Sequence, residues 1–247
     1  MSDGKTGGRA RREERLRSVW GGGSVATDRY RALAATLMRD GARVLHAGCG
    51  WDKSRITGPR KDHVQLVGID VSERAAKLYH SPFIRASIDR IPFADASFDL
   101  VLSDYVVEHL PEPEQSFREM ARVLAPGGHL LIVTPNKLSY KSLAATLIPG
   151  ALHGMIGRMR YGQGAEADMF PTFYRCNSPA RLRQVAEQAG LTDLRIELVN
   201  NGPTWFTSVP VVFGVADVYH RALSRWDTGA PLRCAMVLQA RKPPAAA

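Results

Sequence analysis

The stretch from Arg43 to Asp70 constrains the fold more than any other part of the sequence. An apolar run over 43–47 predicts a buried strand, and it stops at Gly48-Cys49-Gly50, where two glycines permit a turn that a Cβ atom would block. A second apolar run over 64–69 ends in Asp70. This pattern is typical of a nucleotide-type site, in which backbone N–H groups approach the ligand and the carboxylate accepts from ribose. A purely structural turn explains the glycines equally well, so other parts of the sequence are needed to choose between the two interpretations.

The composition is that of an ordinary globular chain. It has 247 residues, of which 45% are hydrophobic and 23% charged, which fits one large domain or one domain with a substantial insertion. We find no apolar run of about 18 residues, so no transmembrane segment is expected, and Met1 to Arg17 lacks the apolar core of a secretory signal. Three widely spaced cysteines indicate neither a disulfide framework nor a metal site, which favours a reducing, cytoplasmic location.

Part of the formal net charge of +9 lies near the N-terminus. Six basic residues among the first 17 are interleaved with Asp3, Glu13 and Glu14, and Gly21-Gly22-Gly23-Ser24 follows as a flexible break. We therefore expect a flexible basic N-terminal arm over 1–24 and a globular domain over 25–247. A nucleic-acid-binding tail is the alternative, but the interleaved acids argue against it.

The remaining sequence alternates between strand and helix patterns. Helices are expected at about 26–39, after the cap Ser72, and over 116–124, 179–189 and 211–223. Strands are expected at 43–47, 64–69, 82–86, 100–103, 129–134, 191–199 and 234–240. Such alternation predicts an α/β protein with a doubly wound parallel sheet, in which ligands bind at the carboxyl ends of the strands.

The segment 137–177 interrupts this alternation. It carries two amphipathic helical patterns, has no acid between Lys137 and Ala165, and ends in the aromatic cluster Phe170-Pro171-Thr172-Phe173-Tyr174. This composition suits a lid or a substrate pocket, while a helical hairpin packed on the sheet edge is the structural alternative. Peripheral contact of the basic hairpin with a membrane surface also stays open, although a lid is favoured.

A series of motifs downstream of the glycine turn is more specific. It consists of Ile91-Pro92-Phe93, Ser97-Phe98-Asp99-Leu100-Val101, Val107-Glu108-His109-Leu110 and Arg122-Val123-Leu124-Ala125-Pro126-Gly127-Gly128. In this series the chain resembles the class I S-adenosylmethionine-dependent methyltransferases of the small-molecule, type 11-like kind. The resemblance covers about 40–136 closely and the later strands loosely. It implies a Rossmann-like seven-stranded sheet, mostly parallel with an antiparallel last strand and a helical insertion after strand five, and an enzyme of class EC 2.1.1 with S-adenosylmethionine as cofactor.

The resemblance also implies roles for particular residues. The glycine turn would lie beside the methionine part of the cofactor, Asp70 would bind both ribose hydroxyls, and Val71 would flank the adenine. The chain departs from the family pattern at His46, where an acid is usual, and at Asp52, where a third glycine is usual. An acid is also often found at the position of Ser87, which leaves Ser87 and Ile88 as the adenine-edge contacts, ahead of Asp89. The expected cofactor-binding residues are His46, Gly48, Gly50, Asp70, Val71, Ser87, Ile88 and Ser103.

Methyl transfer from a sulfonium is an in-line displacement, in which positioning of donor and acceptor can supply ~7–11 kcal/mol of the barrier. An O–H or N–H acceptor then needs only a general base, for which His109 is the candidate. A histidine that is merely hydrogen-bonded at a helix start is the alternative for His109. Tyr105 and Tyr174 either border the acceptor pocket or simply pack. No metal ligand set is expected.

Three functions are compatible with these residues. The favoured one is methylation of a small-molecule acceptor at oxygen or nitrogen, such as a natural-product or sugar intermediate. The second is a catalytically silent methyltransferase-like subunit that binds a partner through the insertion, motivated by His46 and Asp52. A nucleic-acid methyltransferase ranks last, because Ser103-Asp104-Tyr105-Val106 stands where a base-flipping enzyme of that kind has an Asn-Pro-Pro-Tyr-like step. The sequence leaves open whether the chain forms a homo-oligomer.

Overall fold

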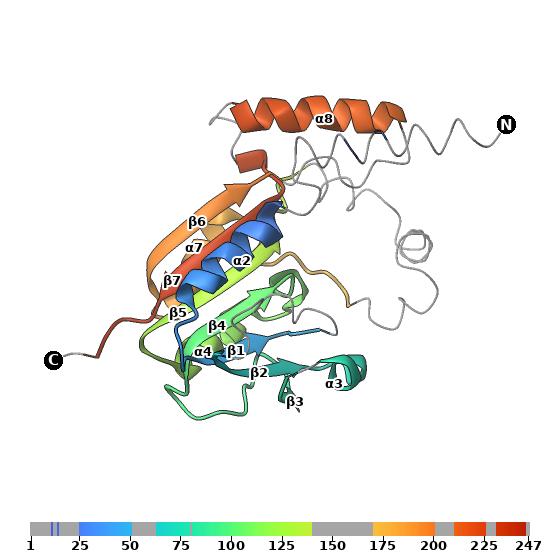
Figure 1. Cartoon of the computed structure of the whole chain (residues 1–247). Coiled ribbons are helices and arrows are strands. Elements are labelled where there is room, and N and C mark those ends of the chain that lie inside the picture. Colours follow the sequence, from blue (N-terminus) through green and yellow to red (C-terminus); the bar gives the residue numbers. More distant parts are fainter. Residues whose placement is uncertain are drawn as a thin grey trace.

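The computed structural model describes residues 25–50, 63–79, 81–139, 170–200, 210–225 and 231–245, together with Arg11 and Glu14. Its centre is a seven-stranded sheet in the order β3-β2-β1-β4-β5-β7-β6 (Figure 1). The strands are β1 (Arg43–Ala47), β2 (Gln65–Asp70), β3 (Phe83–Arg85), β4 (Phe98–Asp104), β5 (Leu124–Pro135), β6 (Thr192–Val199) and β7 (Ala235–Arg241). β1 pairs in parallel with β2 and β4, whereas β7 runs antiparallel to both β5 and β6. The expected mostly parallel sheet with an antiparallel last strand is confirmed.

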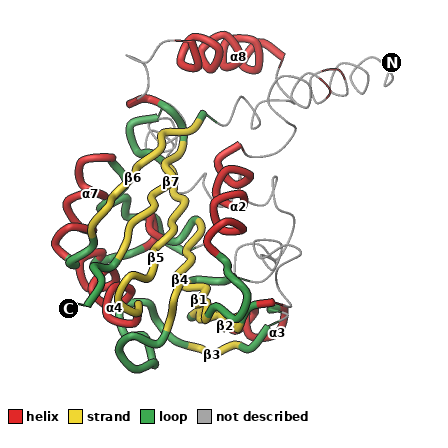
Figure 2. Tube along the Cα trace, turned by 60° about the vertical axis from the view of Figure 1, so that its left-hand side comes forward, coloured by secondary structure: helices red, strands yellow, loops and turns green. Residues whose placement is uncertain are grey.

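Helices cover both faces of this sheet (Figure 2). The described helices are α2 (Val25–Leu37), α3 (Glu73–Leu78), α4 (Pro113–Val123), α7 (Pro179–Gln188) and α8 (Pro210–Arg225), with a 3₁₀ turn, η3, at Val107–His109. Of these, α8 lies beyond one end of the sheet (Figure 1). On one face, α2 buries Ala26, Tyr30 and Ala34 against the sheet. On the other face, α4 and α7 bury their apolar stripes against strand residues such as Leu130 and Ile132. Full burial of one large aliphatic or aromatic side chain contributes about 1.5–3 kcal/mol, so these two cores hold the layers together.

Most expected elements are present with shifted ends. α4 begins at Pro113, earlier than its apolar stripe suggests, because the fixed φ of a proline suits the first turn of a helix. β4 begins at Phe98, whose ring is buried, and the cap Ser72 accepts hydrogen bonds from the N–H groups of Arg74 and Ala75. The glycine pair 127–128 of the last motif lies inside β5, where Gly127 has a φ of +78°. The N-terminal arm, apart from Arg11 and Glu14, and 140–169 of the expected insertion lie outside the described residues.

An ion pair joins the start of β1 to β4. Asp99 accepts hydrogen bonds from the backbone N–H of Arg43 at 2.9 Å and from its guanidinium nitrogens Nη2 at 2.8 Å and Nε at 3.2 Å. The hydrogen bond from Arg43 holds the pKa of Asp99 below its ordinary value of 3.8. A carboxyl with a lowered pKa in the folded state contributes stability above that ordinary value, and the contribution is lost as the pH falls through the lowered pKa.

Substituting Asp99→Asn should therefore lower the free energy of unfolding at pH 7 and have less effect in acid. The side chain is 44% exposed, so we expect a loss of at most about 1 kcal/mol at pH 7. Urea unfolding at pH 7 and below pH 3 measures the difference, which should shrink in acid. Glu187→Gln, which removes a carboxylate from an exposed helical pair on α7, is the control. A loss for Asp99→Asn that is equal at both pH values would contradict the charge-based explanation.

Candidate active site

The glycine turn after β1 is fixed to the end of β2. Gly48 and Gly50 have φ values of +73° and +58°, a region that favours glycine. The N–H groups of Gly48 and Cys49 both donate to the carbonyl of Ile69, at 2.8 and 3.0 Å. A Cβ atom on Gly48 would lie 2.4 Å from a methyl carbon of Val106, so the close approach of the two strand ends requires glycine here.

Asp70 joins the loops that follow β1 and β2. Its Oδ2 accepts from the N–H of Gly50 at 2.9 Å, and its Oδ1 accepts from the N–H of Ser72 at 2.8 Å. The side chain therefore has a fixed orientation, although the residue is 9% exposed and lines a cavity. Each carboxylate oxygen can accept about two hydrogen bonds, so acceptor capacity remains for two hydroxyl groups of a ligand.

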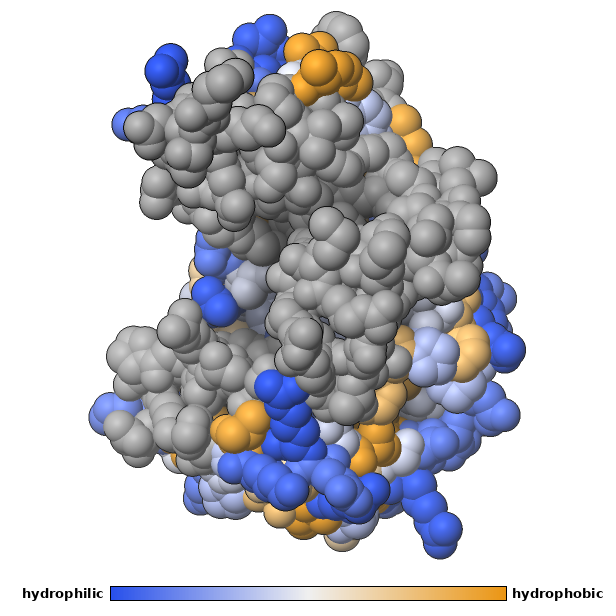
Figure 3. All heavy atoms as spheres, turned by 90° about the vertical axis from the view of Figure 1, so that its right-hand side faces the viewer, coloured by the Kyte–Doolittle hydropathy of each residue, from blue (hydrophilic) through white to orange (hydrophobic). Residues whose placement is uncertain are grey.

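A cavity of about 330 Å³ lies at the carboxyl ends of β1, β2, β3 and β4. Eight of the residues expected at the site line it: Gly48, Gly50, Asp70, Val71, Ser87, Ile88, Tyr105 and His109. Ala86, Val106, Leu110, Pro111 and Phe170 also line it and were not assigned from the sequence. On the side of the molecule seen in Figure 3, hydrophilic and hydrophobic residues of the described part are interspersed. The cavity thus brings together residues that lie up to 122 positions apart in the chain, from Gly48 to Phe170.

Three of the expected site residues do not line this cavity. His46 is 1% exposed, and its Nε2 lies 2.9 Å from Oδ1 of Asp104 while its Nδ1 lies 3.3 Å from the hydroxyl of Tyr79. Burial raises the pKa of Tyr79, so the phenol stays protonated and can donate to Nδ1. Ser103 is buried within β4. Tyr174 has a φ of +50°, and its N–H donates to the carbonyl of Glu108.

His109 is held at the rim of the cavity by the segment that returns to the sheet after residue 169. Its Nδ1 lies 3.0 Å from the carbonyl oxygen of Pro171, and its ring meets that of Phe170 edge-on at 6.2 Å. A carbonyl can only accept, so Nδ1 carries the hydrogen, and in a neutral imidazole the lone pair is then at Nε2. The N–H of Phe173 also donates to the carbonyl of Glu108 at 2.8 Å. The tautomer that a general base needs is therefore set by the backbone of 170–175.

Buried polar groups fasten this returning segment to β5. The carboxylate of Glu108 accepts from the hydroxyl of Thr134 at 2.9 Å, and that hydroxyl accepts from Nδ2 of Asn177 at 2.6 Å. The carbonyl of Asn177 accepts from the N–H of Lys137 at 2.8 Å. These contacts join Asn177 to Thr134 and Lys137, at and just beyond the end of β5.

Two further observations concern ligands. Within the described ranges, no group of three or more His, Cys, Asp or Glu side chains is arranged to hold a metal ion. No helix among the described residues is both long and apolar enough to cross a membrane. For the expected nucleoside cofactor, by contrast, the described residues fit: a carboxylate that is fixed by two N–H groups faces the cavity beside a glycine turn that leaves no room for a Cβ atom.

Comparison with known proteins agrees with this fold and site. Residues 45–132 match the family described as a methyltransferase domain. The 27-O-demethylrifamycin SV methyltransferase of Amycolatopsis mediterranei is 33% identical over 118 residues, which are 43% of this chain and 42% of that protein. A Mycobacterium tuberculosis protein named "Probable S-adenosylmethionine-dependent methyltransferase" is 34% identical over 107 residues, 39% of this chain and 37% of that protein. The aligned region thus spans about two fifths of the length of these relatives.

Solved structures share the fold. That of the [4+2]-cyclase SpnF has a TM-score of 0.55 at 20% identity and covers 88% of this chain and 81% of its own. The strand order and these neighbours define a Rossmann-like fold, with the cavity at the carboxyl ends of its strands. Together with the family match over 45–132 and the named relatives, this fold supports a class I S-adenosylmethionine-dependent methyltransferase domain.

Proposed function

We propose that the protein transfers a methyl group from S-adenosylmethionine to an oxygen or nitrogen atom of a small-molecule acceptor, such as a natural-product or sugar intermediate. Asp70 carries the proposal, because its carboxylate is fixed by two backbone N–H groups and lines the cavity with acceptor capacity for a ribose. The rifamycin relative, which is named as a methyltransferase of a small molecule, supports this acceptor class.

The residues around the cavity divide into two groups. Gly48 and Gly50 would border the methionine part of the cofactor, Asp70 the ribose, and Val71, Ser87 and Ile88 the adenine. Tyr105, whose hydroxyl lies 3.3 Å from that of Thr27, would border the acceptor with His109. The domain would extend over 25–247, with 137–177 as the lid over the acceptor. His46 and Ser103 would act on the cofactor only through the residues around them, since neither lines the cavity.

His109 would accept the proton of the acceptor. The bound cofactor supplies a methyl carbon that is bonded to a positively charged sulfur. An acceptor oxygen or nitrogen would take that methyl group, the electron pair of the former carbon–sulfur bond would stay with sulfur, and Nε2 of His109 would take the acceptor's proton. Because the Pro171 carbonyl holds the hydrogen on Nδ1, the lone pair of Nε2 is the basic site of the ring.

Substituting His109→Gln should lower kcat by about 10²–10⁴-fold, the usual contribution of a general base. It should also remove the rise in kcat with pH that accompanies loss of a proton from an imidazole. A pH–rate profile at saturating cofactor measures both effects. His63→Gln, which changes an exposed imidazole away from the cavity, is the control. An unchanged kcat in His109→Gln would reduce His109 to a structural hydrogen-bonding residue.

A catalytically silent, partner-binding subunit is the alternative, and one observation favours it. A [4+2]-cyclase shares this fold, so the fold alone does not require methyl transfer. The deciding experiment incubates the purified full chain with S-adenosylmethionine and panels of phenols, hydroxylated lactones, sugars and amines. Mass spectrometry then detects S-adenosylhomocysteine and a product heavier by one methyl group. Cofactor binding without turnover of any acceptor would favour the silent subunit, and no cofactor binding at all would contradict the proposed function.

The proposed location and partners of the enzyme rest on the composition of the sequence. We propose a cytoplasmic enzyme that acts on a small molecule and not on nucleic acid. Peripheral contact with a membrane and assembly into a homo-oligomer remain open alternatives, for which gel filtration and vesicle sedimentation are the direct measurements.

A further inference from the structure

Helix α4 contacts or adjoins the chain segments that carry two walls of the cavity. One wall, Ala86 to Ile88, follows β3 and is called the adenine wall below; the other, His109 to Pro111, is called the acceptor wall. α4 begins at Pro113, two residues after the end of the acceptor wall. Its position therefore fixes the acceptor wall directly through the chain.

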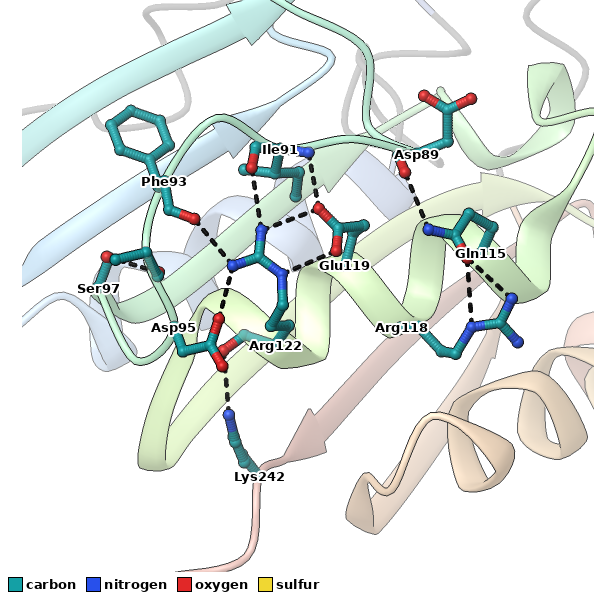
Figure 4. Close-up of polar contacts among 11 residues, drawn as sticks. Asp89, Ile91, Phe93, Asp95, Ser97, Gln115, Arg118, Glu119, Arg122 and Lys242 are labelled. Atoms are coloured by element: carbon teal, nitrogen blue, oxygen red, sulfur yellow. Dashed lines mark hydrogen bonds and ion pairs between the residues drawn. The ribbon is translucent and has the colours of Figure 1, made fainter.

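The same helix holds the chain that leaves the adenine wall (Figure 4). Gln115, Glu119 and Arg122 lie at i, i+4 and i+7 on one face of α4, a spacing that aligns side chains along a helix. Gln115 Nε2 donates to the carbonyl of Asp89 at 3.1 Å, and Glu119 Oε2 accepts from the N–H of Ile91 at 2.8 Å. Arg122 donates to the carbonyls of Ile91 at 2.9 Å and Phe93 at 2.8 Å.

These contacts form one rigid unit. Arg122 donates to both carboxylate oxygens of Glu119, at 2.7 and 2.9 Å, and to Asp95 at 2.8 Å. The hydrogen bond from Arg122 holds the pKa of Glu119 below its ordinary value, so the carboxylate stays charged. Lys242, from the chain after β7, donates to the carbonyls of Arg122 and Leu124 at the end of α4. A planar guanidinium with this many fixed partners has little freedom to move.

The backbone that α4 holds is continuous with the adenine wall. The N–H of Arg90 donates to the carbonyl of Ser87 at 3.2 Å. This hydrogen bond closes a tight turn between the adenine wall and the residues that α4 contacts. Ile88 is 6% exposed and packs in the main core, so it cannot shift independently of that turn. Displacement of Asp89 or Ile91 would therefore displace Ser87 and Ile88 at the cavity.

We propose that Gln115, Glu119 and Arg122 are positioning residues that set the spacing between the adenine wall and the acceptor wall. The proposal rests on the proposed function, since it assumes that Ser87 and Ile88 face the adenine. None of the three side chains lines the cavity, so each acts through the backbone of 89–93. We call these three side chains the α4 clamp. Loss of their contacts with 89–93 should weaken recognition of the adenine more than it weakens binding of the rest of the cofactor.

The test compares two ligands on the full chain by isothermal titration: S-adenosylhomocysteine, and its analogue in which a carbonyl replaces the 6-amino group of the adenine. In Arg122→Met the dissociation constant for S-adenosylhomocysteine should rise roughly tenfold, as loss of charged hydrogen bonds implies. The ratio of the two dissociation constants, which measures how strongly the protein prefers S-adenosylhomocysteine to the analogue, should also fall in this variant. Gln115→Leu, which removes the Asp89 contact and the exposed hydrogen bonds from Arg118, should show the same change to a smaller extent. Arg183→Gln, in an exposed pair on α7, is the matched control and should bind like wild type.

The outcomes separate the two proposals. If the wild-type chain binds neither ligand, the proposed function is wrong. If the wild type binds and both variants keep its preference for the adenine ligand, the positioning role is wrong, even where the variants melt at lower temperature. Should Arg122→Met fail to fold, Gln115→Leu decides the question alone.

Discussion

Asp70→Asn is expected to weaken binding of S-adenosylhomocysteine by about a hundredfold or more. The carboxylate can accept one charge-assisted hydrogen bond from each ribose hydroxyl, and each such bond contributes about 1.5–3 kcal/mol. Asparagine keeps one oxygen and replaces the other with an amino group, which cannot accept. That amino group would also face either the N–H of Gly50 or that of Ser72, so one of the two backbone contacts is lost as well. Isothermal titration gives the change in dissociation constant.

The matched control for this substitution is Asp89→Asn. Asp89 is an exposed carboxylate that follows the adenine wall and does not line the cavity, so its loss should change the dissociation constant less than twofold. A thermal melt of both variants checks that they are folded. Near wild-type affinity in a folded Asp70→Asn variant would overturn the ribose-binding role of Asp70, and with it the observation on which the proposed function depends.

Local patterns in the sequence predict much of the sheet and half of the site. The apolar runs before Gly48 and Asp70 are complete strands, and parallel strands present their carboxyl ends at one edge. For that reason the residues just after strands, Gly50, Val71 and Ser87 among them, do come together at one cavity. The information needed for this prediction is local: where a strand ends, and which residue follows.

The sequence does not reveal which face of a strand a side chain occupies at the site. His46 was expected beside the cofactor, yet it lies on the α2 face of β1, where it meets Asp104 from the neighbouring strand. Ser103, one residue earlier on β4, is also buried. The pairing of His46 with Leu102 on β4 decides which residue can meet this imidazole, and this register links positions 56 apart in the chain.

The contacts that Gln115, Glu119 and Arg122 of α4 make could not be predicted from the sequence for a similar reason. Arg122 belongs to the most specific motif of the chain, but a motif does not identify its contacts. Its partners, the carbonyls of Ile91 and Phe93, are backbone groups 31 and 29 residues away, and any residue type could supply them. The apolar lining residues Val106, Leu110 and Pro111 look like ordinary core or turn residues in the sequence. Contacts that depend on backbone atoms or on shape leave no pattern in side-chain identity.

Gly48→Ala should destabilise the protein far more than Gly41→Ala, although both glycines have nearly the same backbone conformation. Their φ values are +73° and +79°, so alanine costs about 1–2 kcal/mol of left-handed strain at either position. A Cβ atom at Gly41 meets nothing within 4 Å, whereas one at Gly48 meets Val106 at 2.4 and 2.8 Å. Overpacking of this kind costs a further ~1–3 kcal/mol. Urea unfolding of the two variants measures the difference.

Val106→Ala supplies the decisive comparison. It removes both methyl carbons that a new Cβ atom at Gly48 would strike, and leaves the Val106 Cβ atom at 3.1 Å. The double variant Gly48→Ala/Val106→Ala should therefore be more stable than the sum of the two single losses implies, by about 1 kcal/mol or more. Additive losses would mean that strain alone makes glycine necessary at position 48. A favourable coupling would show that contact between the ends of β1 and β4 imposes the glycine, so that the turn which opens the cofactor site is set by sheet packing.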